Sequence, residues 1–386
     1  MTYRIAITGA GMGGLAAATL LAADGHQITL FERFPEARPL GSGLVVQPVG
    51  LAVLDALGAG KDARALGAPL TRMLGHSGRR IALDVAYRPG QPGLAMHRAA
   101  LFHCLWQAAT RAGVTPTTGH TATGTHETTT GIHLVTDQAA HGPFDLVVDA
   151  SGAGSRLSPL AARALPFGAV WAHVPWPTTD LPGTELRQRY LAARRMAGIL
   201  PIGCLPGDPT PRAAVFWSLS SAELDDWPQR NLSDWKAEVA GFWPAMTPFL
   251  DGISEKAQLT PARYSHGTLP RPYSSRLIHI GDAAHRASPQ LGQGANMALL
   301  DAQALALALR LPLQDALMRY HQTRRWHQGL YQGLSAAFTP QYQSHSRALP
   351  VLRDHLLSPL SRLWPLPRVL SALVSGDLIP PIAGRP

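Results

Sequence analysis

The sequence predicts a mixed α/β protein whose domains are assembled from segments that are not contiguous in the chain. Three observations lead to this prediction. Residues 3–31 read as a strand, a glycine-rich turn, a helix and a second strand. Residues 276–301 again pass from a short buried strand through a loop into a helix. Residues 165–264 are rich in aromatic residues and prolines and contain short runs typical of strands, which predicts an inserted β-sheet domain.

Composition places the chain among globular proteins. Its 386 residues are 46% hydrophobic and 15% charged, enough for a substantial core. The net charge is +9, and the basic residues are spread along the chain without alternating with aromatic residues. We therefore expect a surface that favours anionic cofactors, and we expect no nucleic-acid binding. Cys104 and Cys204 lack metal-ligand spacing, and no metal site is expected. Without a bilayer-length apolar run or a signal-like start, we expect a cytoplasmic protein.

The first element is a dinucleotide-binding fingerprint in its required context. Gly9 permits the tight turn after the first strand, Gly11 lets a pyrophosphate approach the backbone, and Gly14 allows close packing of the helix. Glu32 ends the second strand, where its carboxylate can accept from ribose hydroxyls. An acid at this position disfavours a 2′-phosphate. The stretch therefore predicts a Rossmann-type unit that binds FAD or NAD rather than NADP.

The last strand of the pattern leads into a second ligand-binding stretch. Residues 277–280 form a short, mainly apolar run, Gly281 interrupts it, and Asp282 lies at the carboxyl end of the strand, where it can accept from ligand hydroxyls. Pro289, Gly292 and Gly294 predict a loop whose main chain can approach a flat ligand closely. A helix from about residue 295 places its electropositive end behind this loop, where it would stabilise a ligand that becomes anionic.

These motifs resemble the single-component aromatic hydroxylases, the FAD-dependent group A flavoprotein monooxygenases related to p-hydroxybenzoate hydroxylase. The second stretch matches the family pattern from Gly281-Asp282-Ala283-Ala284-His285 through Pro289 and Gly292-Gln293-Gly294 to Asn296 and Asp301. The resemblance implies that Asp282 binds the ribityl chain and that residues 289–296 face the isoalloxazine ring. It also implies further FAD contacts from Arg33, Gly43 and Arg98. The combined FAD-binding expectation covers Gly9, Gly11, Gly14, Glu32, Arg33, Gly43, Arg98, Asp282, Pro289, Gly292, Gly294 and Asn296.

One motif departs from the family. The usual G-A-D-G-x-x-S-x-x-R, associated with both FAD and nicotinamide binding, is here Asp149-Ala-Ser151-Gly152-Ala-Gly-Ser155-Arg156-Leu-Ser158. Ser151 stands at the aspartate position and Ser158 at the arginine position, with Arg156 two positions away. We expect flavin binding to tolerate these changes, and the nicotinamide encounter to be the step they affect.

The pattern divides the chain into three parts. A discontinuous FAD-binding domain is expected in residues 1–71, 95–165 and 267–337, a β-sheet substrate domain in 72–94 and 166–266, and a C-terminal helical region in 338–386. Within the substrate domain, Tyr190, Met196 and Trp217 are candidates for substrate contact. The leucine- and arginine-containing tail is expected to pack on the flavin domain or on a second subunit. Docking of this tail on an anionic membrane is the less favoured alternative.

The resemblance also implies an activity. NAD(P)H, bound transiently as a co-substrate, would reduce the bound FAD. O₂ would then form a flavin C4a-hydroperoxide, and one oxygen atom would pass to a small aromatic, polyketide or quinone-like substrate. Pro289, in the flavin-facing loop, is the residue nearest this chemistry, and no side-chain base is assigned. A flavin oxidase or reductase on the same scaffold is the alternative, followed by an FAD-binding partner protein without turnover. The protein is expected to be a monomer or a homodimer.

Overall fold

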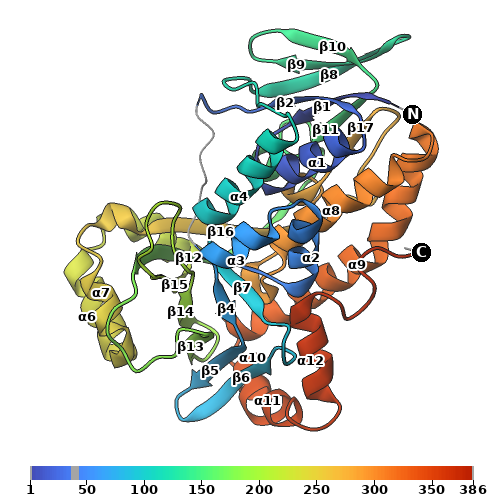
Figure 1. Cartoon of the computed structure of the whole chain (residues 1–386). Helices are drawn as coiled ribbons and strands as arrows, with labels where there is room; N and C mark the ends of the chain where they lie inside the picture. The colour runs from blue at the N-terminus through green and yellow to red at the C-terminus, as the bar shows by residue number, and fades with distance from the viewer. Residues whose placement is uncertain (1, 36–42, 385–386) are drawn as a thin grey trace.

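The computed structural model describes residues 2–35 and 43–384 and shows two sheets of different character joined by long helices (Figure 1). Of the Gly41-Ser42-Gly43 stretch, only Gly43 lies within the described residues. The mixed α/β class predicted from the sequence is confirmed.

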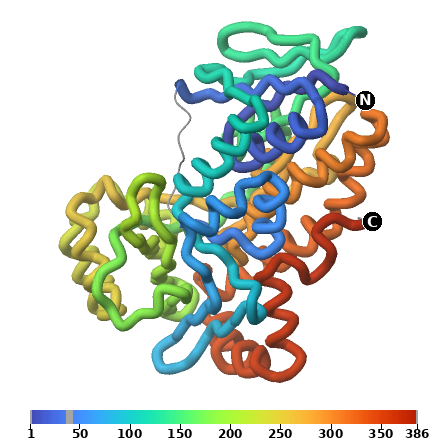
Figure 2. The backbone as a smooth tube through the Cα atoms, in the orientation of Figure 1, coloured from blue at the N-terminus to red at the C-terminus, as the bar shows by residue number. Residues whose placement is uncertain are grey.

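The first sheet is parallel and brings together segments that are far apart in sequence (Figure 2). Its strand order is β17 (Leu277–His279), β11 (Leu146–Asp149), β1 (Arg4–Thr8) and β2 (Gln27–Phe31). Side chains of β1 alternate between two cores, because successive residues of a strand point to opposite faces. Ile5 and Ile7 pack in the helical core, whereas Ala6 packs with Ile132 and Leu134 of the strands on the other face.

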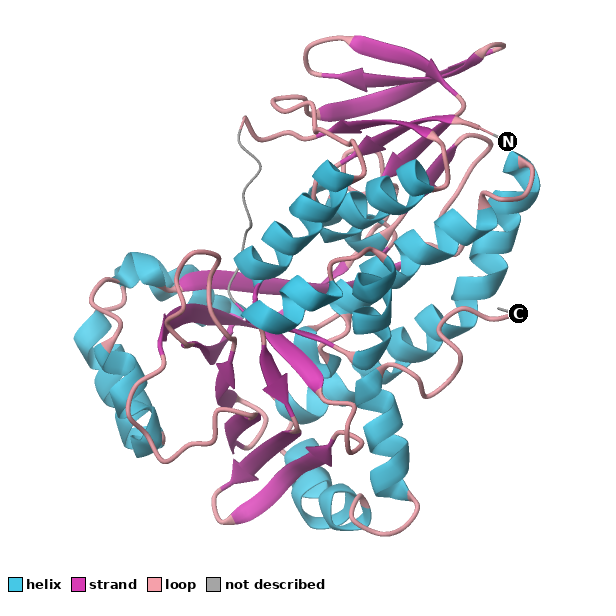
Figure 3. Cartoon of the chain, viewed as in Figure 1, coloured by secondary structure: helices cyan, strands magenta, loops and turns pink. Residues whose placement is uncertain are grey.

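Helices cover one face of this sheet and a three-stranded antiparallel layer covers the other (Figure 3). The helices are α1 (Met12–Ala23), α4 (Arg98–Arg111) and α8 (Gly294–Ala308), with α2 (Pro48–Ala56) and α3 (Gly60–Leu66) beside them. The layer consists of β8 (Ala122–Thr128), β9 (Gly131–Thr136) and β10 (Ala140–Phe144). Its first strand lies in a threonine-rich stretch, residues 115–130, and the side chains on the outer face of this layer are largely exposed.

The second sheet has eight strands in the order β18-β16-β12-β15-β14-β13-β5-β6. These strands are β5 (Arg72–Ser77), β6 (Arg80–Ala86), β12 (Arg163–Pro175), β13 (Glu185–Leu191), β14 (Arg195–Pro201), β15 (Arg212–Ser220), β16 (Thr260–Thr268) and β18 (His285–Arg286). Helices α5 (Ser221–Asp226), α6 (Leu232–Phe242) and α7 (Thr247–Asp251) pack with it around a tryptophan-rich core. A small sheet of β3 (Gly43–Val46), β7 (Gly93–His97) and β4 (Ala68–Leu70) lies at the junction.

The C-terminal part begins with one long helix, α9 (Leu313–Tyr342), whereas the sequence pattern predicts two helices, over residues 311–323 and 326–337. No glycine or proline separates the two predicted segments, and Arg324 and His327 are fully engaged on the buried side of the helix. The chain continues through α10 (Ala348–Leu352), a π-helical turn η7 (Arg353–Leu357), α11 (Ser358–Leu360) and α12 (Leu366–Ser375). Across the described part of the chain, no helix combines the length and apolarity needed to cross a bilayer.

Candidate active site

The N-terminal fingerprint forms a tight turn at the carboxyl end of β1. Gly9 has φ +99°, and a Cβ there would lie 2.5 Å from the Ala150 carbonyl oxygen. A Cβ on Gly14 would lie 1.8 Å from the Gly9 carbonyl oxygen, so α1 can approach β1 this closely only without a side chain. Gly11 has open space where its Cβ would be, and it begins α1 without a side-chain cap. The helix N-terminus therefore remains available to an anionic ligand group.

Glu32 holds the same turn from the second strand. Its carboxylate accepts hydrogen bonds from the backbone N–H groups of Ala10, at 2.7 Å, and Phe34, at 3.1 Å. A carboxylate can accept further bonds, so this arrangement leaves capacity for ribose hydroxyls. Arg33 is exposed and stacks over the Phe34 ring with its guanidinium close to Gly154. The fingerprint residues form one cluster at the edge of the sheet, outside the large cavity described next.

A cavity of about 530 Å³ lies between the eight-stranded sheet and the loops that follow two strands of the parallel sheet, represented by Ala153 and Asp282. Among the expected cofactor residues, Gly43, Arg98, Asp282, Pro289, Gly292 and Gly294 line it. The loop before α8 faces the cavity because Gly292 adopts the left-handed conformation, with φ +61°. Helix α8 then starts without a side-chain cap or an acid in its first turn. Its N-terminus is thus electropositive toward the cavity, as the sequence predicts.

Three cavity-lining residues have a buried donor atom without a partner among the described residues: Arg98 Nε, Gln47 Nε2 and Arg353 Nη2. Arg98 and Gln47 lie on the side of the expected cofactor residues. Burial lowers the pKa of Arg98, and the nearby Asp282 carboxylate opposes this effect. The backbone of Gln47 is fixed, because its N–H donates to Asn296 Oδ1 at 2.8 Å. Unmatched buried donors are costly, so they indicate a ligand with acceptor oxygens. Flavin carbonyls and ribityl or phosphate oxygens fit that requirement.

Asn296 has a different role from the one expected. It is fully buried and does not line the cavity. Besides accepting from Gln47, its Nδ2 donates to the carbonyl oxygens of Val45, at 3.1 Å, and Gly292, at 3.0 Å. These bonds use its side-chain capacity on backbone groups. Asn296 therefore positions β3 and the flavin-facing loop relative to α8.

Asp301 anchors this loop from behind. Its carboxylate accepts from Arg324 Nε and Gln328 Nε2, both at 2.9 Å, from the Gly281 N–H at 3.0 Å, and from His285 Nε2 at 2.6 Å. Burial alone would raise the pKa of Asp301, but the charges of His285 and Arg324 hold that pKa far below its usual range. His285 is consequently an anchoring residue and does not reach the cavity as a base.

The motif that departs from the family forms a compact turn beside the cavity. Asp149 is buried at the end of β11 and accepts from His279 Nδ1 at 2.7 Å, Ser155 Oγ at 2.6 Å and the Ser151 N–H at 3.1 Å. Burial raises the pKa of Asp149, but the bonds from His279 and Ser155 outweigh burial and keep it below its ordinary value. Ser158 Oγ donates to the Ala283 carbonyl, which ties this turn to the flavin-facing segment.

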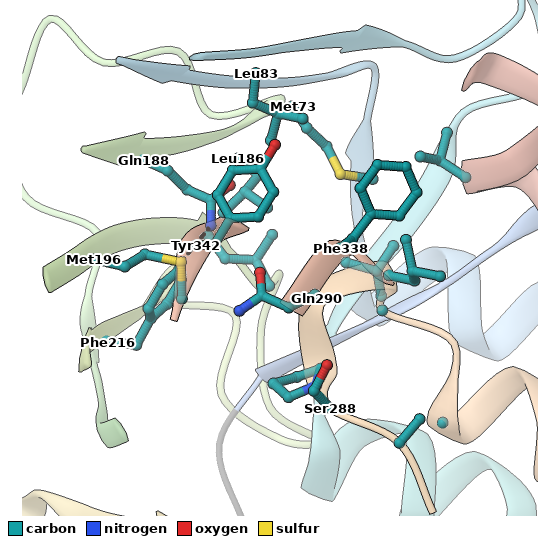
Figure 4. Close-up of a pocket in the computed structure, with 18 of the residues that line it drawn as sticks. Met73, Leu83, Leu186, Gln188, Met196, Phe216, Ser288, Gln290, Phe338 and Tyr342 are labelled. Carbon is teal, nitrogen blue, oxygen red and sulfur yellow. Dashed lines mark hydrogen bonds between the residues drawn. The ribbon is translucent and has the colours of Figure 1, made fainter. Parts of the chain in front are cut away.

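Opposite the flavin-facing loop, side chains from the eight-stranded sheet and from α9 converge on the cavity (Figure 4). Two of the three expected substrate residues, Tyr190 and Met196, line it. Trp217 does not: it is 1% exposed and packs edge-on against Phe242 in the core beneath α6. Side chains alternate along β15, so its neighbour Phe216 faces the cavity instead. This corrects the expectation for Trp217.

Several lining residues were missed in the sequence, namely Gln47, Gln188, Gln290, Phe338, Tyr342 and Leu373. Gln290 lies in the loop of residues 289–296, and its position next to Pro289 indicates that it faces the cavity. Gln47 ends an apolar strand just before a proline, which is also a readable pattern. Phe338, Tyr342 and Leu373 come from the C-terminal helices, and no local pattern indicates that these helices enclose a site.

A glycine-turn nucleotide site, an electropositive loop over a cavity and an aromatic-lined chamber are the features expected of a flavin-dependent oxidoreductase. Sequence comparison agrees: the family described as FAD binding domain matches residues 2–328, and the chain belongs to this family. It is an FAD-dependent monooxygenase that uses NAD(P)H, as the sequence predicts. Among the alternatives raised by the sequence, the relatives below favour the monooxygenase over an oxidase, a reductase or a partner protein without turnover.

Curated relatives and solved structures extend this finding. The chain is 30% identical to a 2-heptyl-3-hydroxy-4(1H)-quinolone synthase of Mycobacteroides abscessus over 92% of this chain and 94% of that protein. It is 29% identical to the phenazine 1,6-dicarboxylic acid hydroxylase PhzS of Lysobacter antibioticus over 83% and 86%. Klebsiella pneumoniae HpxO complexed with FAD and uric acid has the same fold, with TM-score 0.80 and 19% identity over 97% of this chain and 98% of that chain.

Proposed function

We propose that this monooxygenase hydroxylates an electron-rich aromatic ring that carries an apolar substituent, such as a 2-alkyl-4(1H)-quinolone. The observation that carries the proposal is the composition of the cavity wall facing the flavin loop. Apolar side chains from four elements form most of it: Met73, Leu83, Leu186 and Phe338. Such a wall favours an alkyl chain through burial of apolar surface. Two curated relatives are named as synthases of 2-heptyl-3-hydroxy-4(1H)-quinolone, which supports the same choice.

Polar groups in the same wall would orient the ring. Gln188 and Gln290 line the cavity, and the Tyr342 ring is held beside them by the Arg353 guanidinium, 5.0 Å from the ring centroid. Burial raises the pKa of Tyr342 to about 12, so its phenol stays protonated and can donate to a substrate carbonyl. An amide and a phenol suit a neutral quinolone better than a carboxylate.

The protein's contribution is positioning and shielding. Bound FAD supplies the transfer of electrons from NAD(P)H to O₂ and of one oxygen atom to the ring. Asp282, Arg98 and the N-terminus of α8 would hold it at one side of the cavity, and Glu32 and Gly11 would hold its adenosine end. The eight-stranded sheet and the C-terminal helices would place the substrate ring opposite and exclude water from the space between them. The proposal also divides the chain into FAD-binding, substrate and C-terminal regions. The pairing of β5 with β13 supports this division, because it joins the two segments of the expected substrate domain in one sheet.

Anaerobic reduction of the enzyme-bound flavin tests the substrate class. With NADH or NADPH in excess, we expect 2-heptyl-4(1H)-quinolone to accelerate flavin bleaching, and unsubstituted 4(1H)-quinolone to do so weakly. In air, mass spectrometry should find a product that has gained one oxygen atom. Equal stimulation by both compounds, or by 3-hydroxybenzoate alone, would contradict the proposed apolar subsite.

A pair of variants on one strand locates that subsite. Leu186→Asn introduces a polar group into the cavity wall and should raise KM for the heptyl substrate roughly tenfold or more, since burial of a leucine side chain contributes about 1.5–3 kcal/mol. Leu191→Asn, at an exposed position on the same strand, is the matched control and should leave KM unchanged. FAD absorbance should be the same in both proteins.

A further inference from the structure

The C-terminal segment exposes an unusual amount of apolar surface. Trp364 is 78% exposed and Leu363 is 58% exposed, at the turn that precedes α12. Val351, Leu352, Leu356, Leu357, Leu360, Leu366 and Val369 are also exposed large apolar residues of the same segment. Single exposed apolar residues are ordinary, but a group of this size indicates an interaction surface.

Arginines surround this apolar surface. Arg362 and Arg368 are exposed within the segment itself. Arg79 and Arg80 lie at the tip of the β5–β6 hairpin, which meets the segment through bonds from Ser358 Oγ, at 2.6 Å, and Arg362 Nη2, at 3.4 Å, to the Ile81 carbonyl oxygen. Figure 1 shows this hairpin beside α11 and α12 at one end of the molecule. Throughout the described residues, none of these four arginines has a carboxylate within ion-pair distance.

The inner side of the same segment is the cavity wall. Ser358, Ser361, Leu370 and Leu373 line the cavity, so this part of the chain contributes both to the cavity wall and to the apolar surface. The acid nearest to this surface in the segment, Asp354, is already paired with Arg353. The outer surface is therefore apolar and cationic, without an opposing charge.

We propose that this C-terminal surface, residues 351–369 with Arg79 and Arg80, docks on an anionic phospholipid surface. An exposed tryptophan and leucines flanked by arginines match the headgroup boundary, where apolar groups enter the lipid and guanidiniums meet phosphates. A protein partner would need matching acids to satisfy four arginines at once. The docking goes beyond the proposed reaction, and it would bring the wall of an apolar cavity to the phase in which an alkylated substrate is dissolved.

Vesicle sedimentation of the FAD-loaded, full-length enzyme tests this proposal without any substrate. We expect binding to vesicles of phosphatidylcholine with phosphatidylglycerol at low salt, and little binding to phosphatidylcholine alone or at about 1 M salt. The double variant Leu363→Ser, Trp364→Ser should weaken binding roughly tenfold or more. Arg79→Ser and Arg80→Ser should each weaken it about fivefold. Trp326→Ser, which changes a 68% exposed tryptophan of α9, is the matched control and should bind like the wild type.

Three results would overturn the proposal. The first is wild-type enzyme that stays in the supernatant with anionic vesicles. The second is binding that Trp326→Ser lowers as much as the double variant does. The third is a wild-type dimer in analytical ultracentrifugation that the double variant dissociates, with no vesicle binding, since a second copy would then cover the surface. Unchanged FAD absorbance in all variants shows that they are folded, and the substrate assays above remain independent of the outcome.

Discussion

At the scale of single residues, the site depends on side chains whose hydrogen-bonding capacity the protein itself does not use. Arg98 is the clearest example, because its Nε is buried, belongs to a residue of the cavity wall and has no partner in the part of the chain that the structure describes. By contrast, Asn296 is also polar and also expected to bind FAD, but its side-chain amide forms hydrogen bonds with three backbone groups. Residue type and motif position therefore do not distinguish a side chain that is free to bind a ligand from one that is used within the protein. The hydrogen bonds do.

Arg98→Met should weaken FAD binding by about 10- to 100-fold. Hydrogen bonds that involve a charged group contribute about 1.5–3 kcal/mol, and the methionine retains most of the apolar stem of the side chain. Titration of the deflavinated protein with FAD, followed by flavin fluorescence, measures the change. Arg111→Met, at the exposed end of the same helix, is the control. Equal losses in the two variants would mean that general positive charge attracts the cofactor.

His97 should make the stability of this region depend on pH. Its Nδ1 accepts from the Ala99 N–H at 3.0 Å and so caps α4 immediately before Arg98. Burial, followed by the nearby His173 and Arg212, lowers its pKa to about 4. The folded pKa lies below the unfolded value, so the contribution is complete above about pH 6.5 and is lost as the pH falls toward 4. The loss amounts to roughly 1–3 kcal/mol.

His97→Asn keeps a capping side chain but removes the titration. Urea unfolding at about pH 7 and about pH 5 should show that the variant loses less stability on acidification than the wild type does. The other histidines titrate in both proteins and cancel in this comparison. If both proteins lose the same free energy of unfolding, His97 is not the group responsible.

At the scale of elements, the sequence predicts local structure best where a motif requires a particular backbone geometry. Gly9 and Gly292 have positive φ, and Gly14 permits a contact that any Cβ would block, so the residue type alone indicates the local structure. The face of a strand is less evident. Trp217 and Phe216 are both apolar on a strand that is buried on two sides, and no alternation shows which one faces the cavity. The contribution of α9 and α12 to the site depends on contacts distant in sequence, which no local pattern encodes.

Two glycines of the same turn should separate folding from cofactor binding. Gly14→Ala places a Cβ against the Gly9 carbonyl and should lower the free energy of unfolding by about 1–3 kcal/mol or more, because α1 must move away from β1. Gly11→Ala meets no atom of the described residues within 4 Å and should leave the apoprotein as stable as the wild type while weakening FAD binding. Urea denaturation of the apoproteins measures the first effect and FAD titration the second. Equal stability of the two apoproteins would show that the turn is more adaptable than its geometry indicates.

Asp301 should be among the most stabilising charged residues, because it joins three elements through buried bonds. Asp301→Ala leaves the Arg324 guanidinium uncompensated and should cost about 3–5 kcal/mol. Asp55→Ala removes the partner of Arg64 in a pair whose side chains are half exposed, and should cost no more than about 1 kcal/mol. Chemical denaturation of both variants at one pH compares them. Similar losses would contradict the anchoring role of Asp301.

At the scale of the whole molecule, the expected cofactor residues and the proposed substrate wall belong to different parts of the structure. The parallel sheet and its helices have their own core and carry most of the residues expected to bind the cofactor. The substrate side of the cavity is closed by the C-terminal segment, which a fully buried arginine attaches to the rest of the protein. Arg353 lies 4.9 Å from the Tyr190 ring centroid and 5.0 Å from that of Tyr342, and Nη1 donates to the carbonyl oxygens of Ala192 and Gln341. Loss of this attachment should therefore affect one ligand and not the other.

Arg353→Met should release the C-terminal segment while leaving the flavin site intact. The variant loses two carbonyl bonds and leaves the mostly buried Asp354 unpaired, a change that costs roughly 3–5 kcal/mol, whereas the core around the cofactor is not touched. We expect FAD binding within about twofold of the wild type, trypsin cleavage near residue 347 at a higher rate, and loss of substrate-stimulated flavin reduction. Arg347→Met, at an exposed position in the same segment, should retain that stimulation. If Arg353→Met instead loses FAD together with substrate response, the segment supports the whole fold, and the separation of the two sites is wrong.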